Sequence, residues 1–314
     1  MEGPRIEVIG LGKSYAGVTA LDGVNLRLGG GGVLAVLGHN GAGKTTLLDI
    51  LSTRTLPSTG TATVCGYDVV RKPRSVRRRV GVTGQSVAVD DTLSARGNLV
   101  LIARLLGARP AAARARAGEL IDTFDLADAA DRPARTYSGG MRRRLDLAAG
   151  LVGDPDVLFL DEPTTGLDPV SRNGLWEIVG RLAENGTTVL LSTQYLEEAD
   201  RLADEIVVLG MGRVVASGTP DQLKAGIGRR TVTMSFADAD TARDAAFVLN
   251  NSGMEPLHDQ ANRTVTAPLH AAGDLADFIR SLDRLEIGIG ELTVAEPTLD
   301  DVYLALHRTG WRTP

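Results

Sequence analysis

The first two thirds of the chain alternate short apolar runs with segments of helical period. Four of these runs are continuous enough to be strands buried on both faces, at residues 33–37, 156–160, 187–192 and 205–209. A helix is predicted at residues 45–51, shortly after the first run. Buried strands that alternate with helices are typical of a parallel sheet covered on both sides. The pattern therefore predicts an α/β domain with a mostly parallel sheet.

The segment between the first two of these strands has the composition of helices. Residues 92–131 are rich in Ala, Leu and Arg, and all three residue types are good helix formers. A further helical run follows at residues 141–151. We therefore expect a helical subdomain at about residues 92–150, inserted between strands of the sheet.

The pattern changes near residues 226–228, where two glycines flank an isoleucine. Beyond this point, strands and helices are predicted in alternation at residues 231–236, 240–250, 263–267 and 272–282. Thr298 and Asp301 then have the spacing of a capping box at the start of a last helix. We expect one larger domain at residues 1–225 and a small α/β accessory domain at residues 226–314.

Composition narrows the class of protein. A length of 314 residues suits about two domains, and 43% hydrophobic and 23% charged residues are ordinary for a soluble globular protein. The net charge of −5 gives no reason to expect nucleic acid as a partner. Cys65, the one cysteine, excludes an intrachain disulfide and favours a reducing compartment. No apolar run approaches the roughly 18 residues of a membrane span, and no secretion signal is recognisable.

A glycine-rich segment at residues 38–45 follows the first buried strand, and we call it the phosphate loop. It fits the pattern G-x-x-x-x-G-K-[ST] with Gly38, His39, Asn40, Gly41, Ala42, Gly43, Lys44 and Thr45. Such glycines let backbone N–H groups converge on phosphate oxygens at a helix N-terminus. Lys44 is expected to reach the outer phosphates, Thr45 to ligate Mg²⁺, and Thr46 to join the nucleotide contacts. A glycine turn with a chance Lys-Thr pair is the alternative, which the flanking strand and helix disfavour.

Two adjacent carboxylates end the second buried strand. In α/β sheets this edge lies beside the phosphate loop. Asp161 suits the Mg²⁺ shell, and Glu162 suits the general base that polarises the attacking water. In a generic sequence such a pair is more often a solvated turn, but the neighbouring motifs favour the catalytic interpretation.

A third motif, which we call the signature segment, consists of Ser138, Gly139 and Gly140. It precedes the helical run that begins at Met141. A serine N-cap followed by two glycines leaves backbone N–H groups free to bind an anion. A well-capped helix is the alternative when the segment is considered alone.

The order of these motifs resembles that of the ABC-transporter ATPases, over about residues 6–223. The resemblance implies a P-loop NTPase fold of ABC type with ATP and Mg²⁺ as cofactors. In that superfamily, the signature segment binds the γ-phosphate held by the opposite subunit, so two ATP molecules are sandwiched between two copies. It therefore implies a second copy of the chain and a separate integral-membrane permease as partners.

The resemblance assigns three more positions to the site. Gln85 looks like the loop glutamine that senses Mg²⁺ and the attacking water and faces the permease. Tyr15 looks like the aromatic residue that stacks on adenine, with a simply packed ring as the alternative. Asp168 matches the acidic residue of the loop that communicates across the dimer.

Two positions depart from the commonest family pattern. Gln194 stands where most ABC ATPases have a histidine that touches the γ-phosphate, and Met141 replaces a glutamine after the signature segment. Glutamine can donate a neutral hydrogen bond but cannot become cationic. Gln194 remains a candidate catalytic residue together with Glu162 and Lys44. The hydrolysis rate depends on how well its neutral hydrogen bond replaces that of the usual histidine.

The sequence around Gln194 and the segment at residues 296–306 are similar to ATPases of the daunorubicin/doxorubicin resistance exporters. This resemblance implies export of a hydrophobic drug or antibiotic by a complex at the cytoplasmic side of the cell membrane. Three alternatives stay open: a slow or non-hydrolysing subunit, an importer subunit, which the segment at residues 298–306 disfavours, and a soluble ABC protein without a transport role. Proteins of the last kind usually carry two ATPase domains or a long coiled-coil insertion, and neither is recognisable here.

Overall fold

The computed structural model describes residues 3–84, 89–227, 230–251, 256–269 and 273–308. The chain divides into two compact units, one ending at Pro220 and the other beginning at Asp221. We call them the nucleotide-binding unit and the C-terminal unit. Helix α8 (Pro220–Ile227) runs across the predicted domain boundary after residue 225, because Gly226 belongs to the last turn of this helix instead of a linker.

The nucleotide-binding unit is built around a six-stranded sheet of order β10-β9-β3-β8-β7-β6. The strands are β3 (Val33–Leu37), β6 (Val80–Thr83), β7 (Val157–Asp161), β8 (Thr188–Thr193), β9 (Glu205–Gly210) and β10 (Arg213–Gly218). All neighbours pair in parallel except β9 and β10. Every residue of β3, β7 and β8 is buried, so both faces are covered, as the continuous apolar runs predicted.

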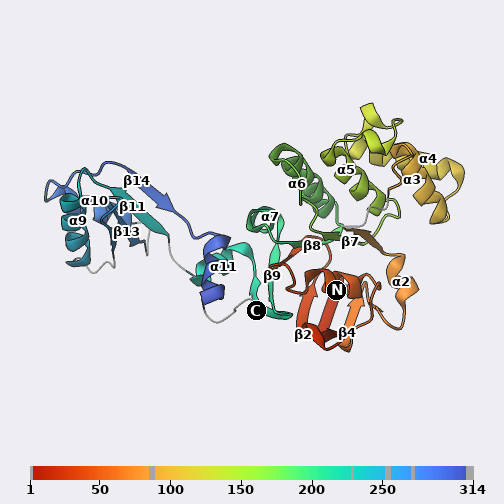
Figure 1. Ribbon diagram of the computed structural model, residues 1–314, viewed down its shortest axis with the longest axis horizontal. Coiled ribbons are helices and arrows are strands. Elements are labelled where there is room, and N and C mark those ends of the chain that lie inside the picture. The colour runs from red at the N-terminus through yellow and green to blue at the C-terminus, as the bar shows by residue number, and fades with distance from the viewer. Residues whose placement is uncertain (1–2, 85–88, 228–229, 252–255, 270–272, 309–314) are drawn as a thin grey trace. The chain divides into compact units, whose positions relative to one another are not determined.

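The two faces of this sheet contact different layers (Figure 1). Leu158 and Leu160 of β7 pack with the helices inserted after β6, whereas Val157 and Phe159 pack with α1 (Lys44–Leu51) and a second sheet. Side chains alternate between the faces because successive residues of a strand point to opposite sides. The sheet therefore holds the phosphate loop, which joins β3 to α1, on a core that is rigid on both sides.

The second sheet is antiparallel and was not predicted. Its order is β2-β1-β4-β5, with β1 (Ile6–Tyr15), β2 (Val18–Leu28), β4 (Thr59–Val64) and β5 (Tyr67–Asp68). The register of β1 against β2 shifts between Val8 and Leu11, where Gly10 has a φ of 58°. Such bulges break the two-residue alternation of apolar positions, so the hydrophobic pattern of β1 is not regular enough to be recognised.

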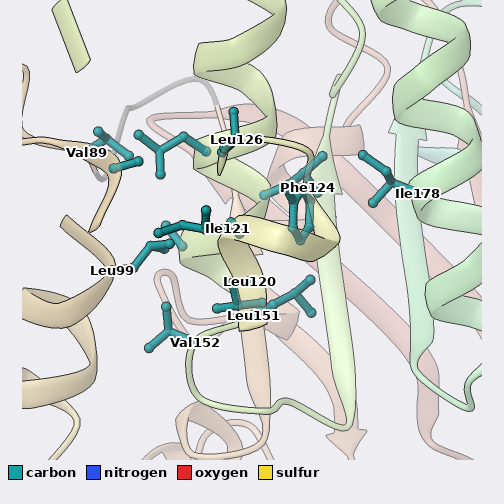
Figure 2. Packing of buried hydrophobic residues seen from close by; sticks show 14 of the residues in the cluster. Val89, Leu99, Leu120, Ile121, Phe124, Leu126, Leu151, Val152 and Ile178 are labelled. Atoms are coloured by element: carbon teal, nitrogen blue, oxygen red, sulfur yellow. The ribbon is translucent and has the colours of Figure 1, made fainter. Parts of the chain in front are cut away.

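The predicted helical segment contains three α-helices packed on one face of the main sheet. They are α3 (Ala95–Leu105), α4 (Pro110–Thr123) and α5 (Gly139–Gly150). Figure 2 shows Leu120 and Ile121 of α4, and Phe124 directly after it, grouped with Leu99 and Leu151. The same layer includes α6 (Pro169–Glu184), which follows β7. Two shorter helices, α2 (Pro73–Arg77) and α7 (Leu196–Leu202), precede β6 and β9.

The C-terminal unit has a βαββαβ order and a four-stranded antiparallel sheet, β12-β13-β11-β14. This is the split βαβ arrangement of ferredoxin-like domains. Its elements are β11 (Thr231–Ser235), α9 (Ala239–Asn251), β12 (Leu257–Asp259), β13 (Thr264–Pro268), α10 (Asp274–Asp283) and β14 (Leu292–Ala295). Apolar residues of β11 and β13 pack against α9 and α10. Thr298 and Asp301 form the predicted capping box at α11 (Leu299–Arg308), since each side chain accepts the backbone N–H of the other.

Candidate nucleotide and catalytic site

The phosphate loop follows β3 and needs glycine at defined positions. Gly43 has a φ of 106°, in the left-handed region, and a Cβ there would lie 2.6 Å from the carbonyl oxygen of Ala20. A Cβ at Gly38 would lie 2.7 Å from the carbonyl oxygen of Leu209. No side chain fits at these points without a backbone shift. The loop therefore presents its own backbone, which is what the binding of phosphate oxygens requires.

Lys44 begins α1 and curls back over the phosphate loop. Its Nζ donates to the carbonyl oxygens of Gly38 at 2.7 Å and His39 at 3.2 Å. The same Nζ lies 3.3 Å from Oε1 of Glu162, and the two side chains are 4% and 13% exposed. The structure thus brings the predicted phosphate-binding lysine and the predicted general base together in one nearly buried site.

Two of the three residues predicted at the Mg²⁺ site, Thr45 and Asp161, also meet. Thr45 Oγ1 donates to Asp161 Oδ2 at 3.1 Å, and Ser192 Oγ donates to the other carboxylate oxygen of Asp161. A hydroxyl and a carboxylate are hard oxygen ligands of the kind that Mg²⁺ accepts. The described residues contain no group of three or more His, Cys, Asp and Glu that could hold a metal. The Thr45 hydroxyl and the Asp161 carboxylate fit an ion that takes its other ligands from phosphate and water.

Ser192 was not predicted as part of the site. It lies opposite Asp161 in the β7–β8 pairing, and it also accepts from the backbone N–H of Glu162 at 3.2 Å. A small polar residue at the end of a buried strand was the available signal, but only the strand register shows which carboxylate it serves.

Glu162 is held in an uncommon backbone conformation directly after β7. Its φ is 48°, in the left-handed region that non-glycine residues rarely adopt. Its N–H donates to the Ser192 carbonyl oxygen at 3.0 Å, and its own carbonyl oxygen accepts from Thr165 N at 3.3 Å. Such a conformation persists only where several contacts hold it, and it is frequent at active sites.

The signature segment caps α5 as predicted. Ser138 Oγ accepts the backbone N–H of Met141 at 3.2 Å, and the helix begins at Gly139, earlier than Met141. A Cβ at Gly140 would lie 2.4 Å from Ser171 Oγ in α6. Gly140 is therefore needed for the close packing of these two helices, while Ser138 and Gly139 are exposed and leave the helix N-terminus accessible.

Asp168, predicted to belong to a communicating loop, is the N-cap of α6. Its Oδ1 accepts the backbone N–H groups of Val170 at 3.1 Å and Ser171 at 3.0 Å. Hydrogen bonds from the Ser171 side chain and backbone hold the pKa of Asp168 below its ordinary value. The carboxylate stays ionised and fixes the end of the loop that begins at Glu162.

Tyr15 ends β1 and is 44% exposed, with Lys13 Nζ 4.7 Å from the centre of its ring. It pairs with Val18 across the β1–β2 turn, and Ala20 of the same hairpin abuts Gly43. An accessible aromatic ring therefore lies on the hairpin that borders the phosphate loop, which suits the stacking of a base.

Of the two glutamines of the predicted site, the structure describes Gln194 but not Gln85. Gln194 is exposed and follows β8 directly, while the neighbouring Tyr195 N–H donates to Thr193 Oγ1 at 2.9 Å. Gln85 lies outside the described residues, although Gly84 before it is described. The role of Gln85 stays a prediction.

A buried carboxyl behind the site was missed by the sequence analysis. Glu198 in α7 is 0% exposed and accepts from Trp176 Nε1 of α6 at 3.0 Å. Burial raises the pKa of Glu198, and hydrogen bonds from Thr193 and Trp176 oppose this shift. The group joins the helix that follows Asp168 to the helix that follows Gln194, and no local pattern would have indicated it.

Comparisons with known proteins show which family the chain resembles. The family model described as ABC transporter matches residues 21–165. The chain is 47% identical to the daunorubicin/doxorubicin resistance ATP-binding protein DrrA of Streptomyces peucetius, over 96% of the chain and 92% of that protein. It is 45% identical to the doxorubicin resistance ATP-binding protein DrrA of Mycobacterium tuberculosis, over 96% and 93%. The structure of CbiO1 from Clostridium perfringens, described as part of an ABC transporter complex, has a TM-score of 0.66 and 25% identity and covers 80% of this chain and 98% of its own.

Proposed function

The chain belongs to the ABC transporter ATP-binding proteins of the daunorubicin/doxorubicin resistance type, and from this we propose that it drives drug or antibiotic export by Mg²⁺-dependent ATP hydrolysis. The comparisons confirm the resemblance, the α/β P-loop fold class and the ATPase class that the sequence motifs predicted. The observation that carries the proposal is the meeting of Lys44, Thr45, Asp161 and Glu162 at the ends of β3 and β7.

Each of these residues has a distinct part in the proposed reaction. The phosphate loop and Lys44 bind the phosphate oxygens and spread the charge that develops during transfer. Thr45 and Asp161 would hold Mg²⁺, which supplies electrostatic stabilisation of the phosphate oxygens when bound. Glu162 accepts a proton from the attacking water. Gln194 donates a neutral hydrogen bond from the end of β8.

The site is completed by a second copy of the chain in this proposal. The accessible N-terminus of α5 at the signature segment would bind the γ-phosphate of ATP held in the partner's phosphate loop. Two nucleotides then close the dimer, and their hydrolysis reopens it, which biases a two-state permease. Tyr15 stacks on the adenine, and Gln85 and Asp168 relay the nucleotide state.

The membrane component would be a separate permease. No helix among the described residues is long and apolar enough to cross a bilayer. The resistance proteins in the comparisons are named for daunorubicin and doxorubicin, and a similar subunit is described as part of a transporter complex. We therefore place this chain at the cytoplasmic face of the membrane as a peripheral subunit, with a hydrophobic drug or antibiotic as cargo.

The test is the ATPase rate of the purified chain with Mg²⁺ and ATP. Glu162→Gln should lower kcat by about 10²-fold or more while ATP binding is retained, because loss of a general base costs about 10²–10⁴. Glu177→Gln, an exposed carboxylate on α6, is the matched control and should keep the normal rate. Equal rates in Glu162→Gln and the native chain would contradict an active subunit and favour a slow or non-hydrolysing one.

A further inference from the structure

Three consecutive arginines follow the signature segment, and they diverge to three places. Arg142 forms an ion pair with Asp91, and Arg144 lies 3.3 Å from Asp125. Arg143, between them, points to the end of β7 instead. Three side chains with the same charge on one turn of α5 therefore have different partners, and only the middle one contacts the catalytic strand.

Arg143 donates to backbone carbonyl oxygens with all three of its guanidinium nitrogens. Nε donates to Pro163 at 2.5 Å, and Nη2 donates to Asp161 at 3.2 Å and to Glu162 at 3.1 Å. Nη1 donates to Gly84 at 3.2 Å. Three of the acceptors are consecutive residues around the candidate general base, and the fourth immediately precedes Gln85. One planar group thus ties together two segments that are distant in sequence.

The chemistry of the contact requires arginine. A guanidinium presents its donors in a rigid fork, whereas a lysine ammonium is a single point on a flexible stem and cannot reach four carbonyl groups in fixed directions. Burial lowers the pKa of Arg143, and the nearby carboxylates of Asp146 and Glu198 oppose that shift. The cation is kept in a half-buried position where its hydrogen bonds are with the backbone.

Arg143 contacts the backbone around Glu162, which has an uncommon conformation. Glu162 has its φ in the left-handed region, and such residues keep that conformation only when neighbouring contacts determine it. Ser192 supplies acceptors for the Glu162 N–H, and Arg143 supplies donors for the carbonyl groups on either side. Together they orient the carboxylate toward Lys44.

We propose that Arg143 is a positioning residue that couples the signature helix α5 to the general base Glu162 and to the segment leading to Gln85. A displacement of α5 when its N-terminus binds the partner copy's nucleotide is passed to the Glu162 backbone through these hydrogen bonds. Arg143 donates to the backbone carbonyl groups around Glu162 and so acts through the conformation of that residue. The inference rests on the proposed ATPase function and adds the route by which the two halves of the composite site communicate.

Substitution of Arg143 tests this in the full-length chain. Arg143→Gln should lower kcat for ATP about tenfold or more and leave KM within about twofold, because the phosphate loop is untouched. Arg143→Lys should retain the melting temperature and still lose several-fold in kcat, so it keeps the test decisive if the glutamine variant folds poorly. Arg142→Gln is the matched control on the same turn and should keep both constants.

A double substitution separates positioning from a general loss of structure. If Arg143 acts through Glu162, Arg143→Gln should have almost no further effect on kcat in a Glu162→Gln chain, because residues that act as a unit are not additive. Full additivity, an unchanged kcat in both Arg143 variants, or a KM that rises as much as kcat falls would overturn the inference. The proposed function fails separately, when Glu162→Gln alone leaves the rate unchanged.

Discussion

The two units of the chain bury different kinds of side chain. The nucleotide-binding unit buries polar and charged residues as well as apolar ones, namely Lys44, Ser52, Thr83, Asn98, Asp146, Asp161, Thr164, Thr188, Ser192, Thr193 and Glu198. Among the described residues of the C-terminal unit, every buried side chain is apolar. Buried polar groups cost free energy unless they are hydrogen-bonded. Several of them, Lys44, Asp161 and Ser192, belong to the candidate site of that unit.

The largest expected effect on stability is in the apolar core of the C-terminal unit. Phe278 of α10 is fully buried with Val232, Leu249 and Val265, and Phe278→Ala should cost about 3–5 kcal/mol in the free energy of unfolding. Because the two units have separate cores, the loss should appear as faster hydrogen exchange in α9 and α10 but not in β7 and β8.

The exposed Phe247 of the same unit provides the control. It is 67% exposed, and Phe247→Ala should change exchange little, because surface substitutions usually lie within about 0.5 kcal/mol. Equal destabilisation by both variants, or faster exchange of the main sheet in Phe278→Ala, would show that the units do not differ in the way described.

The stability of the nucleotide-binding unit should depend on pH through a buried carboxyl group. The pKa of Glu198 is raised by burial above its ordinary value of 4.5, so between that value and the raised pKa the folded state holds more protons than the unfolded chain. The free energy of unfolding therefore falls as pH rises through this window, by at most about 1.4 kcal/mol per pH unit for one group.

Glu198→Gln should flatten this dependence. The amide still accepts a hydrogen bond from Trp176 but does not ionise. The free energy of unfolding of the variant should therefore equal that of the native chain at low pH and increasingly exceed it as pH rises. Denaturant titrations followed by Trp176 fluorescence in a Trp311→Phe background measure the difference. A slope as steep as that of the native chain would mean that another group, such as Asp146, whose pKa is also raised by burial, carries the effect.

The smallest effect is expected at the capping box of α11. Thr298→Ala removes the acceptor of the Asp301 N–H and should cost about 1 kcal/mol. The thermal stability of the C-terminal unit, measured by calorimetry, should fall accordingly and the ATPase rate should not. Thr298→Ser keeps the hydroxyl and should restore stability, and its failure to do so would assign the loss to packing of the threonine methyl group.

Local sequence accounted for much of the site. The phosphate loop, the Ser138 cap and the strand ending at Asp161 were each predicted within one or two residues, because a turn, a cap and a buried strand are determined by neighbouring residues. The paired strands β1 and β2 were not predicted, since bulges in their pairing interrupt the alternation of apolar and polar residues. The C-terminal strands β12 and β14 are short and largely exposed, and they carry too little apolar pattern to be recognised.

By itself the sequence predicted the fold class from its alternating strands and helices, the ATPase family from the order of its motifs, and the candidate residues Lys44, Asp161 and Glu162 from spacing along one strand or one turn. Only the tertiary structure decided that Ser192 serves Asp161, that Glu198 binds Trp176 and that Arg143 holds the backbone of Glu162. Each of these contacts joins residues from different elements. A hydrogen bond of that kind depends on how strands and helices pack, and no short-range pattern records it.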